Sequence, residues 1–567
     1  LDPSTYTVSP NPLTTGTTAV TVSYKYLGSV TQTATQAVTV MEALPTLTDG
    51  YYQLEDAQDL LWFANYVSIM GNTTANAKLV NNIDLTGVTW TRPIGTSTNK
   101  FVGIFDGNGK NISGFNNTAV TTQYFGILGY GLGATIKDLT VNATLTGTSR
   151  YMAAVIGYAD GCTISNVTTD GILSSSGSYN GGIAGNAANA SSFTDCVNNA
   201  SIDVNGSYAG GISGYAAGST TFSNCINNGL INNTKNYSGG IAGYAVGTGT
   251  ISNCANNATV ISAAVSGTYY VGGIVGDHHS TGIISKCVNS GNVTATSTAT
   301  TAVYNVGGIA GYVYAASTID QCYNSGTING GVMNVGGIAG YLYNAASKVT
   351  NCYNIGNVIS NSTSATANVG GVVGYIKVAG SYVQNCYNAD PVSFNTSTST
   401  NIGGVVGYTV DTTNVSNNYY LNTTATEGLG HATDNTVAVT SDQLKALATS
   451  LSSYFSTDTT TINSGYPILN WQVAWYYTVS LDNAITGGIV KTDKASVVEG
   501  DTVTLTVIPA DGKQLKADTL VVSYNDSDNN KQTAALTSGA NNIYTFTMPA
   551  YDVNVTAGFE AIPVGSI

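Results

Sequence analysis

Charged residues are scarce in this sequence of 567 residues, and that scarcity excludes several classes of protein. Asp, Glu, Lys and Arg make up 8% of the chain, where a typical globular protein has about a quarter. The 17 Lys and Arg residues are outnumbered by 31 acidic ones, the net charge is −14, and no basic run occurs. Binding to nucleic acid or to an anionic membrane surface requires clustered basic residues, so the sequence predicts neither partner.

Long hydrophobic runs are also missing. No stretch approaches the roughly 18–20 uninterrupted apolar residues that a spanning helix needs, so no membrane insertion is predicted. The sequence starts without Met and without a signal-peptide pattern, which we expect of a mature or trimmed product. Ser, Thr, Asn and 66 Gly residues dominate instead. They oppose helix and favour strands and tight turns, and the composition predicts an extracellular or cell-surface protein.

A repeat runs through the middle of the chain. A block of the form Gly-Gly-Ile-Ala-Gly-Tyr recurs, and each copy is followed by a second element of the form apolar-Ser/Thr-Asn/Asp-Cys-x-Asn. Looser copies of the block occur at 125–130 and 153–158. The block begins at Gly181, Gly210, Gly239, Gly272, Gly307, Gly336, Gly370 and Gly403. The fourth position of the second element is Leu139, Val167, Cys196, Cys225, Cys254, Cys287, Cys322, Cys352, Cys386 and Asn418.

The repeat predicts an all-β solenoid. With a short apolar piece closing each unit, we expect three short strands per unit, which describe one coil of a right-handed parallel β-helix. Equivalent residues of neighbouring coils then stack roughly 4.8 Å apart. Helical solenoids and propellers do not fit the strand pattern and the unit length. About twelve coils form a rod roughly 55–60 Å long, and insertions at 262–268 and 294–302 are predicted to project from one edge.

The Gly-[Ile/Val]-x-Gly core of each block resembles the GLUG motif of bacterial surface proteins. The resemblance covers roughly residues 50–472, with entry coils at 79–85, 90–95 and 105–112 and a closing segment at 466–471. It implies a β-helix displayed on a cell surface. We therefore assign residues 46–472 to the solenoid domain.

Two helices are predicted to cover the open ends of the solenoid. Residues 54–67 place Leu60, Leu61, Phe63, Ala64 and Val67 on one face, with acidic residues in the first turn, as expected of an N-terminal cap. Residues 441–455 follow the last coil, begin at Ser441 as the predicted N-cap residue, and are predicted to form the C-terminal cap helix.

Small β modules are predicted to flank the solenoid. Residues 1–45 resemble the final strands of a bacterial immunoglobulin-like module but supply only three or four strands, whereas such a sandwich needs about seven. Either the sequence starts inside this module or the missing strands come from another molecule. Residues 473–567 resemble the β-rich modules of internalin-type B repeats, which serve as stalks or spacers in cell-surface proteins.

Seven cysteines share one position in the repeat: Cys196, Cys225, Cys254, Cys287, Cys322, Cys352 and Cys386. A stacked row of thiols could be a metal or redox wire, or a row of small buried hydrophobic side chains. Leu139 and Val167 occupy the same position and bind no metal, so we interpret the row as structural packing. Cys162 lies outside the row. No metal and no cofactor are predicted.

Tyrosines form the candidate binding site. One tyrosine follows each Gly block, at Tyr130 and Tyr158 and then at Tyr215, Tyr244, Tyr312, Tyr341, Tyr375 and Tyr408. Asn186 and Asp277 interrupt this row. An exposed aromatic ladder could stack on sugar rings or anchor a partner protein, and the alternative is a purely structural stack. His278 and His279 are interpreted as chance surface histidines.

The leading functional hypothesis is a non-catalytic extracellular protein, structural or adhesive, that assembles into filaments or a surface layer by strand donation between terminal modules. The predicted partner is a second copy of the chain, or a host or cell-surface glycan or protein. One alternative is a carbohydrate-binding adhesin that uses the tyrosine ladder. A polysaccharide-cleaving enzyme is another, but it would need paired carboxylates on one face, and acids are sparse between residues 150 and 420.

Overall fold

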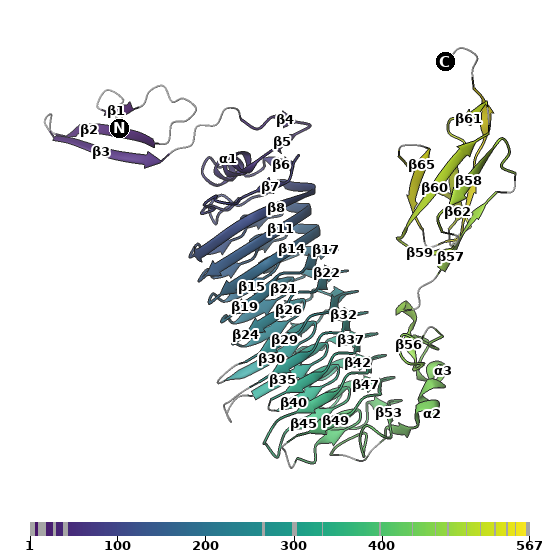
Figure 1. The fold of residues 1–567 in the computed structure, drawn as a ribbon. Helices are drawn as coiled ribbons and strands as arrows, with labels where there is room; N and C mark the ends of the chain where they lie inside the picture. The colour runs from purple at the N-terminus through teal and green to yellow at the C-terminus, as the bar shows by residue number, and fades with distance from the viewer. Residues whose placement is uncertain are drawn as a thin grey trace. The chain divides into compact units, whose positions relative to one another are not determined.

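The chain is a parallel β-solenoid of about 12 turns with a β-rich module at its C-terminal end (Figure 1). The computed structural model describes residues 6–9, 19–26, 30–37, 44–263, 267–296, 303–331, 333–395, 399–431, 433, 435–459, 461–472, 476–482, 484–494, 496–510, 512–526, 529–539, 542–549 and 551–562. Two compact units, Leu1–Pro467 and Ile468–Ile567, are described separately.

From residue 179 onward, each coil of the solenoid contains five short strands. A representative coil has β20 (Tyr208–Gly210), β21 (Ser213–Gly218), β22 (Thr221–Ser223), β23 (Ile226–Asn227) and β24 (Ile231–Asn233). The prediction of three strands per coil is therefore wrong for these coils and holds only for the two coils between residues 124 and 175. The Gly-Gly step separates β20 from β21, and the left-handed backbone of Asn224, at φ 55°, separates β22 from β23. In the first coils, β11 (Thr135–Gly147) and β14 (Thr163–Ser175) are still single long strands that pair in parallel.

Two ten-stranded parallel sheets flank the Gly-Gly step. The first consists of β9 (Tyr124–Phe125), β12 (Tyr151–Met152), β15 (Tyr179–Gly181), β20, β25 (Tyr237–Gly239), β30 (Thr268–Gly272), β35 (Val303–Gly307), β40 (Asn334–Gly336), β45 (Asn368–Gly370) and β50 (Ile402–Gly403). The second consists of β10 (Leu128–Leu132), β13 (Ile156–Asp160), β16 (Ala184–Ala188), β21, β26 (Ala242–Gly247), β31 (Val275–Ser280), β36 (Ala310–Val313), β41 (Ala339–Leu342), β46 (Val373–Ile376) and β51 (Val406–Thr409).

The second element of the repeat builds one corner of the coil. Its Asn/Asp position takes the left-handed conformation, which Asn and Asp adopt more readily than most residues. The following Cys then points inward, and its Sγ donates to the carbonyl oxygen two residues earlier, as from Cys225 to Ser223 at 3.4 Å. The left-handed residues have φ between 52° and 56°, at Asp195, Asn224, Asn253, Lys286, Gln321, Asn351, Asn385 and Asn417.

The last Asn of the element forms a buried amide ladder along the solenoid. Each Nδ2 donates to the Oδ1 of the next coil at 2.7–2.8 Å, in the order Asn198, Asn227, Asn256, Asn289, Asn324, Asn354 and Asn388. Buried amides are costly unless they are hydrogen-bonded, and this ladder satisfies them. The ladder also explains why position 211 is a glycine, because a Cβ there would collide with Asn227 Oδ1 and with the carbonyl oxygen of Gly240.

An uninterrupted apolar column fills the inside of the solenoid. Inward-facing Ile, Val and Phe residues of successive coils stack in register, for example Phe193 on Phe222, with ring centroids 5.1 Å apart. They belong to one cluster that extends from Leu54 to Leu429. Each coil can bury its apolar side chains only against the coils on either side, so the solenoid is stabilised by neighbour contacts.

Both predicted cap helices are present, and one differs from the prediction. Helix α1 (Ala57–Ser68) buries Leu60, Phe63, Ala64 and Val67, and its N-cap Asp56 accepts from the backbone of residues 58 and 59. The second cap is two short helices, α2 (Ser441–Lys445) and α3 (Ala448–Leu451), and its N-cap residue is Thr440 rather than Ser441. Helix α3 ends at Leu451, before the predicted residue 455. At this end Asn417 Nδ2, from the last coil, donates to the carbonyl oxygens of residues 450 and 451.

The insertions predicted at 262–268 and 294–302 leave the same corner of the solenoid. They follow β29 (Val260–Ser262) and β34 (Val293–Ala295), which are the last strands of their coils and pair with each other. Residues 264–266 and 297–302 lie outside the described residues. In the described part of the chain, no helix is long and apolar enough to cross a membrane.

The two ends of the chain contain antiparallel strands. Strands β1 (Tyr6–Ser9), β2 (Ala19–Tyr26) and β3 (Val30–Ala37) form a three-stranded sheet with β2 in the middle. In the C-terminal unit, β58 (Gly488–Thr492), β60 (Thr502–Pro509) and β65 (Ile543–Thr547) are neighbours in a four-stranded sheet. A separate apolar core that includes Leu505, Val522 and Phe546 lies within this unit. The rest of the predicted immunoglobulin-like module, between residues 1 and 43, lies outside the described residues.

Candidate functional site

The tyrosines that follow the Gly blocks stack in register on the second ten-stranded sheet. Tyr130 pairs with Tyr158, Tyr215 with Tyr244, and Tyr341 with Tyr375 on adjacent strands. We call Tyr130, Tyr158, Tyr215, Tyr244, Tyr312, Tyr341, Tyr375 and Tyr408 the first tyrosine row. Tyr130 and Tyr312 are buried, and the other six are half-buried.

A second tyrosine row, which the sequence reasoning missed, lies beside the first. Four of its six members come two residues before a Gly-Gly pair, as in Tyr208-Ala-Gly-Gly and Tyr237-Ser-Gly-Gly, and that fixed offset is the signal that could have revealed them. The second tyrosine row consists of Tyr124, Tyr151, Tyr179, Tyr208, Tyr237 and Tyr270. The two rows together form the tyrosine face.

The rings of the tyrosine face make one continuous stack. From Tyr124 along the second row to Tyr270, across to Tyr312, and along the first row to Tyr408, each step joins ring centroids 4.6–5.4 Å apart. Most neighbouring rings are nearly parallel, so each ring covers the faces of the next. A sugar stacks on a free aromatic face, whereas this surface presents mainly ring edges and phenol hydroxyls.

Burial makes the phenols of the tyrosine face weak acids. It raises the pKa of Tyr237 and of Tyr270 to about 12, and it raises the pKa of Tyr215 and of Tyr244 as well. The phenols therefore remain neutral hydrogen-bonding groups at physiological pH.

Basic side chains of the chain itself lie over tyrosine rings on and beside this face. Lys100 Nζ is 4.6 Å from the centroid of Tyr130, and Arg150 Cζ is 5.2 Å from that of Tyr151. Lys377 Nζ lies 4.1 Å from the ring of Tyr343, which is adjacent to Tyr341. Such contacts are cation–π interactions, attracted by the negative face of the ring.

The histidine interpretation requires a correction. His278 is fully buried, and its Nε2 is 3.1 Å from the carbonyl oxygen of Gly282; burial lowers its pKa to about 4. His279 is half-buried and stacks on Tyr314 at 3.7 Å between ring centroids. His278 and His279 are thus part of the packed structure. In strand β31 the side chains of 277 and 278 are both buried, a departure from simple alternation that the sequence pattern does not reveal.

The tyrosines beside the cysteines form a third stack that the C-terminal segment covers. Tyr323, Tyr353 and Tyr387 stack at 4.9 and 5.0 Å. Tyr353 and Tyr387 are buried, Phe455 packs against both, and the hydroxyl of Tyr387 donates to the carbonyl oxygen of Pro467. This stack attaches the C-terminal cap to the solenoid.

The seven cysteines of the repeat and Cys162 are all buried free thiols. Burial raises the pKa of the thiols of Cys254, Cys287 and Cys352, whereas hydrogen bonds with the thiols of Cys196 and Cys254 lower the pKa of Cys225. Within the described residues, no group of three or more His, Cys, Asp or Glu side chains is placed to hold a metal ion.

Six aspartates of the solenoid serve as acceptors for asparagines of the following coil. Asp138 Oδ1 accepts from Asn166 Nδ2 at 2.8 Å, and Asp195 Oδ1 accepts from Asn224 Nδ2 at 3.0 Å. An ionised carboxylate accepts hydrogen bonds but cannot donate one. It therefore fits the first position of a ladder in which each amide donates to the preceding coil. The same contact occurs at Asp160, Asp170, Asp203 and Asp320.

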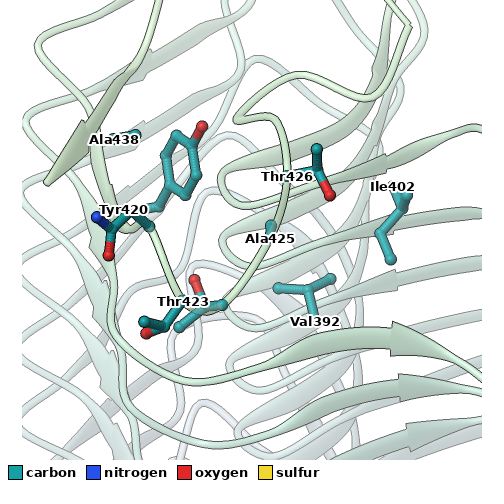
Figure 2. A pocket seen from close by; sticks show the side chains of 9 residues that line it. Val392, Ile402, Tyr420, Thr423, Ala425, Thr426 and Ala438 are labelled. Carbon is teal, nitrogen blue, oxygen red and sulfur yellow. The ribbon is translucent and has the colours of Figure 1, made fainter. Parts of the chain in front are cut away.

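A shallow hollow of about 580 Å³ lies at the C-terminal end of the solenoid. Figure 2 shows Tyr420 and Ala438 on one side and Val392 and Ile402 on the other. The rim carries the hydroxyls of Thr423, Thr424 and Thr426, and the lining includes no charged side chain. This hollow can hold a small uncharged molecule but offers no group for acid–base chemistry.

Comparisons with known proteins identify two kinds of segment. The GLUG motif matches residues 302–329 and 331–359, and the divergent InlB B-repeat domain matches residues 477–563. A search of the curated proteins gave no match. Among solved structures, a Bacteroides ovatus protein described provisionally as an immunoglobulin A1 protease is 17% identical, with 75% of this chain and 94% of that chain covered and a TM-score of 0.29; at that score it carries no argument.

Both segments occur typically in extracellular bacterial surface proteins. The chain is a β-solenoid that contains GLUG motifs, followed by a segment that matches the divergent InlB B-repeat domain.

Proposed function

We propose that the chain is a non-catalytic extracellular surface protein in which the solenoid acts as a rigid scaffold. This proposal rests on the observation that polar side chains of the solenoid are hydrogen-bonded to one another between adjacent coils. The amides form buried ladders, and six solenoid aspartates accept from the next coil. An enzyme that cleaves polysaccharides needs a pair of carboxylates set about the scissile bond, and these aspartates are engaged with asparagines.

Two measurements test this proposal. The purified chain is incubated with pectin, alginate, glycosaminoglycans and immunoglobulin A1, and the products are separated by size; we expect no cleavage above a heat-denatured control. Antibodies against the solenoid are expected to label the outside of intact producing cells in immunogold electron microscopy. Reproducible cleavage of any substrate, or labelling confined to the cell interior, would refute the proposal.

For assembly, we propose strand donation by the N-terminal strands. In the described part of the chain, β1 and β3 are the edge strands of the three-stranded sheet, and the eight residues of β3 pair on one side only, with β2. An unpaired strand edge is a template for a strand from another molecule. A variant with Thr33→Pro removes a backbone donor from this edge strand. We expect filaments in electron micrographs of the unmodified chain and fewer in this variant, whereas monomers in both would exclude the mechanism.

Glycan binding along the tyrosine ladder is the weaker candidate. The stacking of the rings covers the faces that a sugar would use. A glycan array tests this candidate by comparing the unmodified chain with a triple variant, Tyr312→Ala, Tyr341→Ala and Tyr375→Ala. Glycan binding that survives the triple substitution would exclude this ladder as the binding site.

A further inference from the structure

The first tyrosine row is interrupted twice, and both interruptions carry an unsatisfied buried oxygen. Asn186 lies between Tyr158 and Tyr215 on adjacent strands, and Asp277 lies between Tyr244 and Tyr312. Their side chains are nearly inaccessible, at 6% and 3% exposure. In each, the Oδ1 atom has no hydrogen-bond partner among the described residues. Each short side chain stands at the register position that a tyrosine takes in the neighbouring coils.

At Asp277 the surrounding rings depart from the regular stack. Tyr312 stacks on Tyr270 of the second row at 4.6 Å. Tyr244 stacks on Tyr215 at 5.2 Å on one side, and on the other side the ring of His279 lies at 5.9 Å. The carboxylate of Asp277 therefore lies beneath an irregular part of the tyrosine face.

Among the described residues, no positive charge neutralises Asp277 at neutral pH. The nearest candidate is His279, whose Nδ1 is 3.9 Å from Asp277 Oδ1. Burial lowers the pKa of His279 below its ordinary value, so this ring is neutral at neutral pH. In the described part of the chain, the acid among the phenols of Tyr237, Tyr244 and Tyr270 therefore has no cationic partner.

The same surface takes up cations elsewhere. Lys100 lies over Tyr130, Arg150 over Tyr151 and Tyr179, and Lys377 over the adjacent Tyr343. Among the described residues, no Lys or Arg lies within cation–π distance of the rings between Tyr208 and Tyr312. The chain has a net charge of −14 and only 17 Lys and Arg residues, so a cation for this site is expected from outside.

We propose that the interruption at Asp277 binds a lysine or arginine side chain of a basic segment of a partner protein. The cation pairs with the carboxylate of Asp277, beside the phenol groups of Tyr237, Tyr244 and Tyr270. Pairing neutralises the buried acid, and the attraction between opposite charges is stronger where water is excluded. This proposal names a partner chemistry for the tyrosine face and does not depend on whether the chain forms filaments.

Binding at this site is expected to release a proton. Desolvation raises the pKa of Asp277 well above its ordinary value, and an adjacent cation favours the ionised form. The other titratable groups around it are Tyr208, Tyr237 and Tyr270 of the second row, Tyr244 and Tyr312 on the adjacent strands, and His278 and His279 on β31. The phenols keep their protons, and burial lowers the pKa of both histidines, so the released proton comes from Asp277.

Isothermal titration calorimetry of the whole chain at neutral pH tests the proposal. The probe is a blocked peptide with arginines separated by glycines, and its control is the same peptide with neutral citrulline in place of arginine. Each titration is run in two buffers of different ionisation enthalpy, which measures the protons released. Asp277→Asn is compared with Asp203→Asn, which changes the net charge equally at an exposed position.

We expect the arginine peptide, and not the citrulline peptide, to bind the unmodified chain and the Asp203→Asn variant with proton release. Asp277→Asn should weaken binding by about tenfold or more and abolish the proton release. Asn186→Asp, at the equivalent interruption, should add a second binding event. Equal binding by the Asp277→Asn and Asp203→Asn variants would overturn the proposal, as would the absence of binding to the unmodified chain.

Discussion

Replacing Asp277 by Asn should stabilise the solenoid at high pH and leave it nearly unchanged at low pH. Asp277 is 3% exposed, and its Oδ1 has no hydrogen-bond partner in the described part of the chain. Desolvation raises its pKa well above the ordinary value in the folded chain. Asn keeps the size of the side chain and removes the charge, so the substitution isolates the cost of burying an unpaired carboxylate.

The sign follows from proton linkage. A carboxyl whose folded-state pKa is raised binds its proton more tightly in the folded than in the unfolded chain. Its contribution to the stability of the folded chain is fully present below the unfolded-state pKa of about 3.9, and it is lost as the pH rises through the folded-state pKa. The unmodified chain should therefore lose stability upward from about pH 4 through that higher value, and the Asp277→Asn variant should not show this loss.

The magnitude follows from the charge, because Asn at this position would lack the same hydrogen-bond partner. Each unit by which burial raises the pKa of a carboxyl costs about 1.4 kcal/mol of stability once the group is ionised. We therefore expect Asp277→Asn to raise the free energy of unfolding by about 1–3 kcal/mol at about pH 8, and by less than about 0.5 kcal/mol at about pH 4.

Thermal unfolding followed by circular dichroism at a series of pH values measures this effect. Asp203→Asn is the matched control, because it removes an exposed charge and retains an oxygen that can accept from Asn232; we expect its effect to stay within about 0.5 kcal/mol at every pH. A stabilisation by Asp277→Asn that is the same at both ends of the pH range, or a destabilisation at high pH, would refute the reasoning.

Three further predictions concern the inner packing of the coils, and urea unfolding measures each of them. Gly211→Ala places a Cβ against the carbonyl oxygen of Gly240 and Asn227 Oδ1, and should destabilise the chain by more than about 2 kcal/mol. Gly539→Ala is the control, because the nearest atom to its Cβ is 3.3 Å away, and it should cost less. Equal costs for the two variants would contradict this reasoning. Asn256→Leu leaves Asn227 Nδ2 without its ladder acceptor and Asn289 Oδ1 without its ladder donor. Each unpaired group should cost about 1–3 kcal/mol, so the variant should lose about 2–6 kcal/mol. The exposed Asn257→Leu should cost less than about 1 kcal/mol. Cys254→Val should cost less than about 1.5 kcal/mol, because Val167 occupies the same position in an earlier coil; a loss as large as that of Asn256→Leu would give the thiol a role beyond packing.

The repeat unit and its inside–outside pattern could be predicted from the sequence because they depend on neighbours along the chain. The spacing of the Gly blocks and of the cysteines is that of the coils, and the left-handed corner falls at the residue before each cysteine. Tyr208 and Tyr237 were missed although their offset from the Gly-Gly step is constant. The number of strands per coil and the division of the C-terminal cap into α2 and α3 depend on where the backbone turns, which composition alone does not fix.

The sequence by itself determined the parallel β-solenoid, the row of inward cysteines and the first tyrosine row, because repetition places equivalent residues at equivalent positions in every coil. Only the tertiary structure decided which of those residues are covered and which lack partners. Tyr353 and Tyr387 are buried because Phe455 packs against both, and Asp277 is left unpaired because the adjacent coils place rings around it. The physical reason is that burial depends on side chains that come from other coils and from the C-terminal cap, which lie one or more coils away in the sequence.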